Sequence, residues 1–291
     1  MRLKVWINKK LVDVNKAKVS VLDRGFLYGD GLFETMRSYA GTVFKIDEHL
    51  DRLFAASKII KIKIPYERKY LKYAIYRSLE ANKLKSAYVR LTVTRGERGL
   101  GANSGHPMVP NIVIYASEFN GYEDWKYKRG IRVKVATTRQ NEYSPLSRIK
   151  SLNFLNYILA RSSTQREGYD DAILMNTEGY ITEGATSNIF LVKRGVITTP
   201  SLSSGIIPGI ARGVILQIAK RLRLKTRERF VRHRDLLNAE EVFLTNSMAE
   251  VLPVTKIGFE KVGDDKPGPV TKLLHISYQK EVIKEVLGGI L

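Results

Sequence analysis

The sequence predicts an α+β protein of two domains, and three of its features support this prediction. In the first third of the chain, segments with the two-residue alternation of strands precede segments with helical periodicity. A polar, aperiodic stretch from Glu118 to Arg129 follows, and beyond it strand-like and helix-like segments alternate up to a closing helix. At 291 residues the chain can bury two cores of moderate size. We therefore place an N-terminal α/β domain at residues 1–118, a linker at 119–129 and a C-terminal domain at 130–291.

The N-terminal domain is expected to contain mostly strands, with two helices between them. Apolar and polar residues alternate in each strand candidate, and Ala40-Gly41 is typical of a hairpin turn. Asp47 can cap the first helix, and the glycine-rich stretch from Gly96 to Pro107 is expected to form a long loop at a strand end. The expected strands are residues 2–7, 18–22, 33–39, 42–46, 87–95 and 111–117, and the second helix is expected at 66–82.

The C-terminal domain is expected to begin with a strand and to end with a long helix. Pro208 and Gly209 stand where one of its helices should start, as is common at helix N-termini. The expected strands are residues 131–137, 171–175, 187–192, 196–199, 241–244 and 250–255, and the expected helices are 154–166, 210–222 and 270–287.

Composition excludes several classes of function. The chain has no cysteine, which rules out disulfides, thiolate metal sites and cysteine nucleophiles. Its four histidines are spaced too irregularly to pair on one helical face, so no metal site is expected. No stretch approaches the roughly 20 apolar residues of a membrane span. The N-terminus lacks the apolar block of a signal peptide, and we expect a cytoplasmic protein without membrane association.

The formal net charge of +20 raises the alternative of a nucleic-acid-binding protein. Much of this charge lies in residues 220–234, where basic and apolar residues interleave as in a helix end that leads into a strand with a solvated face. No aromatic stacking platform or recognition motif accompanies the charge. We therefore favour a solvated basic surface and expect no nucleic-acid partner.

Two motifs indicate a specific chemistry. The first is the run SRIKSLNFLN at residues 147–156, in which Lys150 is flanked by apolar residues that would help to desolvate its amine. The second is ITEGATSNIF at residues 181–190, where Glu183 and a glycine enter a strand. Taken alone, Lys150 could be a surface lysine and Glu183 a turn residue.

Together these motifs resemble the class IV (fold type IV) pyridoxal-phosphate enzymes, which include branched-chain and D-amino-acid aminotransferases and aminodeoxychorismate lyase. The resemblance extends from about Trp6 to Glu281 and implies the two-domain fold type IV architecture, with the cofactor lysine in the C-terminal domain. It implies that Lys150 carries pyridoxal 5′-phosphate as a Schiff base and acts as the catalytic base and acid. Glu183 would keep the pyridine nitrogen of the cofactor protonated, so that the ring acts as an electron sink.

The resemblance also implies a composite phosphate site. The amides of Ile210 and Ala211 follow Gly209 at a helix start, where the helix dipole and unpaired N–H groups attract an anion. Many relatives have threonine in place of Ala211, so one side-chain bond is absent here. Arg52 matches the arginine that pairs with the phosphate, and Ser247 matches a phosphate-binding hydroxyl. The alternative for Arg52 is an ordinary helix-surface arginine.

The residues expected on the substrate side are less specific. Phe33 lies on the strand that lines the substrate pocket in relatives, and Met248 and Ala249 adjoin Ser247. Arg90 or Arg95 could bind the substrate carboxylate, although either could be structural. The arginine-x-histidine clamp of the D-amino-acid enzymes has no clear match, because only Arg98 and the distant His106 follow. The same enzymes usually have tyrosine where this chain has Phe33.

The resemblance thus implies an aminotransferase that exchanges an amino group between an amino acid and 2-oxoglutarate. We expect an L-amino acid with a branched or other apolar side chain. The first alternative is aminodeoxychorismate lyase, which releases pyruvate and 4-aminobenzoate, and the second is a D-amino-acid aminotransferase. Relatives build the active site at a subunit interface, so a homodimer or a higher assembly is implied.

Overall fold

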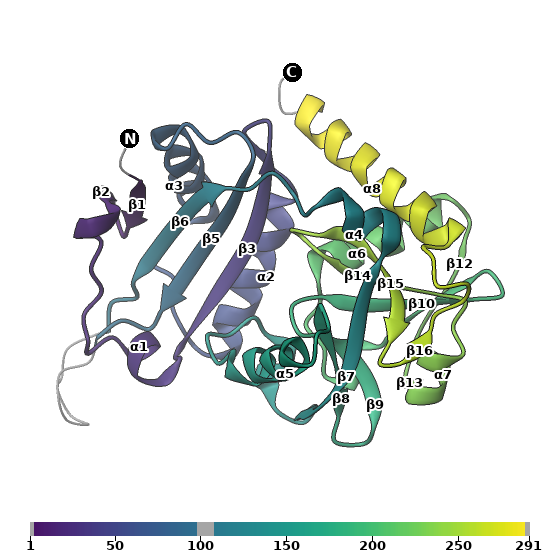
Figure 1. Ribbon diagram of the computed structural model, residues 1–291. Helices are drawn as coiled ribbons and strands as arrows, with labels where there is room; N and C mark the ends of the chain where they lie inside the picture. The colour runs from purple at the N-terminus through teal and green to yellow at the C-terminus, as the bar shows by residue number, and fades with distance from the viewer. Residues whose placement is uncertain (1–2, 98–107, 289–291) are drawn as a thin grey trace. The chain divides into compact units, whose positions relative to one another are not determined.

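The computed structural model describes residues 3–97 and 108–288, which form two compact units (Figure 1). Within the described residues, the first unit comprises the chain up to Asn120, the segment Ile149–Asn153 and the residues from Glu285 onward. The second unit comprises Gly121–Arg148 and Phe154–Lys284. Within residues 3–97 and 108–288, no helix combines the length and the apolar character that a membrane crossing requires.

The first unit is built on an antiparallel sheet with the strand order β2-β1-β6-β5-β3-β4. Helices α2 and α3 lie against the same face of this sheet (Figure 1), where their apolar sides form the core with the inward residues of the strands. Ala40 and Gly41 both have positive φ angles, of 50° and 89°, as a tight hairpin turn requires. The elements are β1 (Lys4–Ile7), β2 (Lys10–Asp13), η1 (Val14–Lys16), α1 (Arg24–Tyr28), β3 (Gly31–Tyr39), β4 (Thr42–Val43), α2 (Ile46–Ile59), α3 (Arg68–Ala81), β5 (Ala87–Thr94) and β6 (Ile112–Glu118).

The strand predicted at residues 18–22 is wrong, because these residues form no strand. The partner of β1 is instead β2, which begins only two residues after β1 ends, in the register Ile7 to Lys10. Asn8 adopts a left-handed φ of 54° in this turn. A two-residue turn of this kind is a local feature, and the pair Asn-Lys is a weaker signal for such a turn than Asn-Gly.

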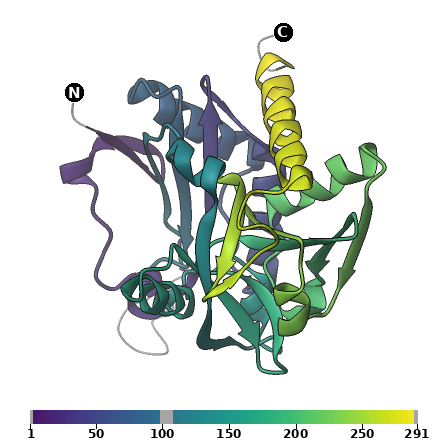
Figure 2. The ribbon, with the colours of Figure 1, turned by 45° about the vertical axis from the view of Figure 1, so that its right-hand side comes forward.

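The second unit contains a mixed sheet with the order β12-β11-β10-β14-β15-β7-β8-β9-β13, and β16 pairs with β15. Helix α5 packs on β7 and β8, and α6 leads into the edge strand β12 (Figure 2). The elements are α4 (Asp124–Arg129), β7 (Ile131–Gln140), η2 (Pro145–Arg148), α5 (Leu155–Arg166), β8 (Asp171–Asn176), β9 (Tyr180–Gly184), β10 (Asn188–Lys193), β11 (Val196–Pro200), η3 (Leu202–Ser204), α6 (Ile210–Arg221), β12 (Lys225–Arg229), β13 (Val231–Arg232), α7 (His233–Leu237), β14 (Glu241–Asn246), β15 (Glu250–Ile257), β16 (Glu260–Lys261) and α8 (Pro269–Gly288).

Two segments lie in places that the local sequence did not indicate. The stretch expected as a linker, residues 119–129, contains helix α4, which packs on β15 of the second unit. The segment Ile149–Asn153, which holds Lys150, follows the first part of the second unit in sequence but belongs to the first unit. It bonds to β3 of that unit, and this long-range pairing decides its position.

Candidate active site

Lys150 is anchored by its main chain beside the start of β3. Its carbonyl oxygen accepts a hydrogen bond from the amide of Phe33 at 3.0 Å, and Leu152 N donates to Gly31 O at 2.9 Å. Ile149 is buried in the core of the first unit. Lys150 Nζ lies 4.5 Å from the centroid of the Phe33 ring, within the range of a cation–π contact. The main-chain bonds and the ring therefore restrict where the amine of Lys150 can lie.

Phe33 brings a second cation into this neighbourhood. Cζ of Arg90 lies 3.9 Å from the centroid of the same ring. The register of β3 and β5 pairs Phe33 with Thr92 and Thr35 with Arg90, which sets Arg90 within reach of the ring. Phe33 is buried. The structure thus brings together three residues that the sequence analysis named separately.

The contacts of Arg95 are those of a structural residue. Its Nε donates to Asp30 Oδ2 at 2.7 Å, Nη1 donates to Lys61 O at 3.0 Å, and Nη2 donates to Ile60 O at 2.7 Å. All three nitrogens of the guanidinium are used within the first unit. Of the two alternatives for Arg95, these contacts support the structural one. They leave Arg90 as the better candidate for a substrate carboxylate.

Arg52 projects from α2 and is held by a buried carboxylate. Arg52 Nε donates to Glu34 Oε1 at 2.8 Å, and Nη2 donates to Glu34 Oε2 at 2.5 Å. His49 Nδ1 lies 2.7 Å from the same Oε2. Glu34 is only 1% exposed, so this bidentate pair is shielded from water. The guanidinium of Arg52 is therefore fixed in one orientation.

The charges of this cluster are set by burial and by its partners. Burial by itself raises the pKa of Glu34, but the charge of Arg52 and the hydrogen bonds from His49 and Arg52 outweigh it and hold that pKa at about 2. Burial, and then the charges of Arg52 and Lys150, lower the pKa of His49 against the opposing effect of Glu34. A neutral His49 donates Nδ1–H to the ionised carboxylate. The roles of Glu34 and His49 were not predicted from the sequence, although an acidic residue inside an apolar strand was a usable signal.

In the second unit, Glu183 lies at the end of β9 and accepts hydrogen bonds on both of its oxygens. Its side chain is nearly fully buried, at 3% exposure. Oε1 accepts from Tyr157 Oη at 3.0 Å and from Gln140 Nε2 at 3.3 Å, and Oε2 accepts from Asn188 Nδ2 and Ile207 N, both at 3.3 Å. Burial, and then the neighbouring carboxylate, raise the pKa of the Tyr157 hydroxyl, so it stays a donor. Donors on both oxygens stabilise an ionised carboxylate in a place without bulk water.

Asn188 connects Glu183 to the start of α6. Besides Glu183, its Nδ2 donates to Ile207 O at 3.0 Å. A Cβ atom at Gly209 would lie 1.8 Å from Asn188 Oδ1, so only glycine permits this close approach. Helix α6 then begins at Ile210 without a side-chain cap. Glu183 and the helix N-terminus are thereby held in one rigid frame.

The first amides of α6 are available to an anion. The first bond inside the helix runs from Gly213 N to Gly209 O at 3.0 Å. The amides of Ile210 and Ala211 precede it and have no intrahelical acceptor. With the positive end of the helix dipole they form a favourable site for a phosphate.

The loop between β14 and β15 carries Ser247 on a tight turn. Asn246 Oδ1 accepts hydrogen bonds from Met248 N at 2.9 Å and from Ala249 N at 2.7 Å, so the side chain of Asn246 organises this loop. Glu250 follows with a left-handed φ of 60°. Its carboxylate lies 3.1 Å from His275 Nε2 of α8, which holds the strained residue in place. Met248 and Ala249 are buried, and Arg98 and His106 lie outside the described residues.

Comparison with known proteins decides the family. The profile of the family described as Amino-transferase class IV matches residues 31–257, which is most of the chain. The chain belongs to the class IV aminotransferases. The family, the two-domain α+β architecture and the enzyme class predicted from the sequence are thereby confirmed.

Similar proteins cover nearly the full length of this class IV aminotransferase. A Methanocaldococcus jannaschii protein is 38% identical, over 98% of this chain and 96% of its own length. Its name describes it provisionally as a branched-chain-amino-acid aminotransferase. The D-alanine aminotransferase of Bacillus licheniformis is 32% identical, over 97% and 98%. A crystal structure of a branched-chain amino acid aminotransferase from T.th., which contains pyridoxamine 5′-phosphate, has a TM-score of 0.92 and 29% identity, over 98% and 95%.

Proposed function

We propose that this class IV aminotransferase moves an amino group between an L-amino acid with a branched or other apolar side chain and 2-oxoglutarate. Its cofactor is pyridoxal 5′-phosphate. The observation that carries the proposal is the frame of Glu183, Asn188 and the start of α6. A buried carboxylate suits the protonated pyridine nitrogen of this cofactor, and the first amides of α6, at Ile210 and Ala211, suit its phosphate. The branched-chain names of two of the similar proteins support the substrate class.

When bound, the cofactor supplies an electron sink for the bonding electrons at the substrate α-carbon. Lys150 is proposed as the residue that holds the cofactor covalently. Once the incoming substrate amine displaces Lys150 from the cofactor, its free Nζ would take the proton from the substrate α-carbon and pass it to C4′ of the cofactor. The ring of Phe33 and the main-chain bonds to β3 restrict where the amine can lie, which supports this role. Glu183 keeps the pyridine nitrogen charged throughout.

The phosphate is proposed to be held by Arg52, by the Ser247 hydroxyl and by the amides of Ile210 and Ala211. Ala211 contributes no side-chain hydroxyl, so its share is the amide alone. Both oxygens of Glu34 bind the guanidinium of Arg52, which fixes where its positive charge lies before an anion arrives. A charge that is oriented in advance loses little entropy when it binds the phosphate.

We expect Arg52→Ala to weaken cofactor retention more than it slows turnover at saturating pyridoxal 5′-phosphate. Loss of a charge-assisted phosphate pair costs about 2–4 kcal/mol. It also leaves the buried Glu34 without its main counter-charge. Equilibrium dialysis against graded cofactor measures the change, with Arg77→Ala, an exposed arginine of α3, as the matched control. An unchanged cofactor affinity would leave Arg52 with a structural role alone, as the partner of the buried Glu34.

The substrate side of the site is proposed to contain Phe33, Arg90, Met248 and Ala249. Arg90 is the proposed partner of the substrate carboxylate, since Arg95 is occupied by Asp30 and two carbonyls. The amides of Met248 and Ala249 already donate to Asn246, so these residues would act through their apolar side chains and the shape of the loop.

A panel of amino donors tests the proposed function. We expect L-leucine or L-glutamate to exceed its D-enantiomer by at least roughly tenfold in kcat/KM, or about 1.4 kcal/mol, because the sequence has no clear match to the arginine-x-histidine clamp of the D-amino-acid enzymes. Amino transfer to 2-oxoglutarate is measured for each donor under one set of conditions. A preference for D-donors would favour the alternative suggested by the D-alanine aminotransferase relative.

The lyase alternative is tested in the same assay. Aminodeoxychorismate is offered as substrate, and pyruvate release is followed in the absence of an amino acceptor. Pyruvate release faster than amino transfer would replace the proposed function by the lyase. We expect no more than a trace of pyruvate.

We also propose a homodimer or a higher assembly, located in the cytoplasm. Leu155, Ile158 and Leu159 are more than half exposed on one side of α5, and an apolar helix face of this kind is typical of an interface. The absence of cysteine is compatible with a reducing compartment. Light scattering of the holoenzyme measures the assembly, and a monomer at micromolar concentration would contradict this part of the proposal.

A further inference from the structure

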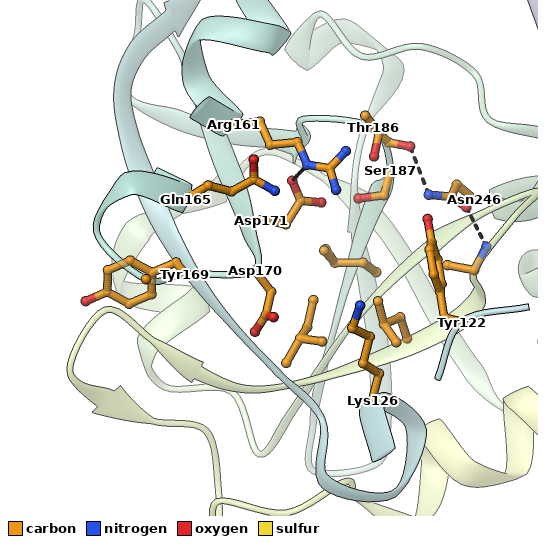
Figure 3. Close-up of a pocket in the computed structure, with 15 residues that line it drawn as sticks. Tyr122, Lys126, Arg161, Gln165, Tyr169, Asp170, Asp171, Thr186, Ser187 and Asn246 are labelled. Atoms are coloured by element: carbon orange, nitrogen blue, oxygen red, sulfur yellow. Dashed lines mark hydrogen bonds and ion pairs between the residues drawn. The ribbon is translucent and has the colours of Figure 1, made fainter. Parts of the chain in front are cut away.

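The second unit contains a cavity that none of the proposed cofactor residues lines. Its volume is about 410 Å³, which is within the range of small-molecule sites. Arg161 of α5, Asp171 at the start of β8 and Ser187 before β10 lie together along one side of it, and Lys126 of α4 lies on the opposite side (Figure 3). Lys150, Glu183 and Ser247 are not part of its lining.

Two buried polar atoms in the cavity wall have no hydrogen-bond partner among the described residues. Ser187 Oγ neither donates a hydrogen bond to a described residue nor accepts one, and Arg161 Nε donates none. Ser187 is only 8% exposed, so its hydroxyl is also shielded from bulk water. The nearest acid to Arg161 Nε is Asp171 Oδ1 at 3.8 Å, which is too far for a hydrogen bond. Buried polar groups are normally satisfied, so two unsatisfied donors side by side indicate an acceptor supplied by a ligand.

The charges of the wall select the kind of ligand. Lys126 and Arg161 are balanced by Asp170 and Asp171, so the lining carries no net charge. A phosphate or a dicarboxylate would meet two carboxylates, whereas a zwitterion is complementary to both signs. Burial raises the pKa of Asp171 to about 6 even though the Ala172 amide and Arg161 stabilise its charged form. A cationic group beside Asp171 would relieve that desolvation.

The spacing of these charges suits an α-amino acid. Asp171 stands directly beside Arg161, and in an α-amino acid the ammonium and carboxylate groups are attached to the same carbon. Ile131, Leu244 and Leu252 add apolar surface to the cavity, which can receive an apolar side chain. Size, charge balance and apolar surface therefore agree on one class of ligand.

We infer that this cavity is a second site, which shares only Ala249 with the proposed active site and binds a free α-amino acid as a zwitterion. The carboxylate accepts hydrogen bonds from Arg161 Nε and the Ser187 hydroxyl, and the ammonium group pairs with Asp171 and Asp170. This inference goes beyond the proposed function, because it concerns regulation rather than turnover.

The structure provides a connection from this cavity to the active-site loop. Thr186 and Asn246 both line the cavity, and Asn246 Nδ2 donates to Thr186 O at 3.1 Å. The oxygen of the same Asn246 side chain accepts from the amides of Met248 and Ala249, which follow Ser247. A ligand that stabilises Thr186 and Asn246 also stabilises the turn that presents Ser247.

Calorimetry of the holoenzyme with α-methyl-L-leucine tests the inference. This amino acid has no hydrogen on its α-carbon, so transamination cannot consume it. We expect two equivalents to bind per chain. One equivalent should bind at the active site and change the visible absorbance of the cofactor. The other, which we call the silent equivalent, should bind in the cavity and release or take up heat without any change in absorbance. A wild-type chain with no binding beyond the equivalent that changes the absorbance would overturn the inference.

Two variants identify the second equivalent. Ser187→Ala removes only the unpaired hydroxyl, and Arg161→Gln removes the positive charge, and each should weaken the silent equivalent by roughly tenfold or more. Arg166→Gln, an exposed arginine on the same helix, is the matched control and should change neither equivalent. Undiminished silent binding in both cavity variants would overturn the assignment. A failure of the proposed function would appear separately, as a missing absorbance change with the silent binding intact.

Discussion

Lys150→Ala is expected to abolish amino transfer while the protein remains folded. The substitution removes the amine that we assign both to cofactor attachment and to proton transfer. Loss of the proton transfer alone slows such reactions on the order of 10²–10⁴-fold. The main-chain bonds of Lys150 to β3 do not need the side chain, because its carbonyl oxygen still accepts from Phe33 N. The fold should therefore tolerate alanine at this position.

The measurement combines single-turnover kinetics with thermal unfolding. Lys58→Ala on α2 is the control, since Lys58 is exposed and lies outside the proposed site. The variant at Lys150 should melt within a few degrees of the wild type and lose the visible absorbance of the covalently held cofactor. Turnover within tenfold of the wild type would remove the central residue of the proposed function.

Glu183→Gln is expected to leave the cofactor bound but to slow proton transfer severely. Glutamine has the same shape but no charge, so the pyridine nitrogen is no longer kept protonated. Loss of one preorganised electrostatic contact of this kind costs on the order of 10²–10³ in rate. The amide also brings a donor into a place where Tyr157, Gln140, Asn188 and Ile207 already donate. One side of the network must then rearrange.

Tyr157→Phe separates the charge of Glu183 from its network. Phenylalanine removes one donor to Oε1 but leaves the carboxylate and its contacts with Asn188 and Ile207. Its rate should fall far less than that of Glu183→Gln. Both rates are measured with saturating cofactor, whose retention is determined by its absorbance after gel filtration. If Glu183→Gln remains within threefold of the wild type, Glu183 is a turn residue and the pyridine nitrogen has another partner.

Local sequence features predicted most of the elements of both units. The hairpin at Ala40-Gly41 needs two residues with positive φ, and Pro208-Gly209 is a common start for a helix such as α6. Such requirements act over a few residues, so they are visible in the sequence. The motifs around Lys150 and Glu183 are also short, continuous runs of sequence. Each is associated with one proposed role, cofactor attachment for Lys150 and contact with the pyridine nitrogen for Glu183.

The partners of these residues could not be predicted, because they come from distant parts of the chain. Glu34 and Arg52 are 18 positions apart, and Gln140 and Glu183 are 43 apart. The structural role of Arg95 became apparent only when Asp30 and the end of α2 came within reach of its guanidinium. Neither the periodicity of the sequence nor a short motif predicts contacts between residues so far apart in the chain.

By itself, the sequence determined the order of most strands and helices, the family, and the residue types for one cofactor. The tertiary structure decided which arginine is the better candidate for a substrate, how Arg52 is oriented, and that Lys150 belongs with β3. It also decided that Arg161 and Ser187 line a cavity with unpaired donors. The reason is physical: turns and caps depend on neighbouring residues, whereas the burial and pairing of a charge depend on groups that only folding brings together.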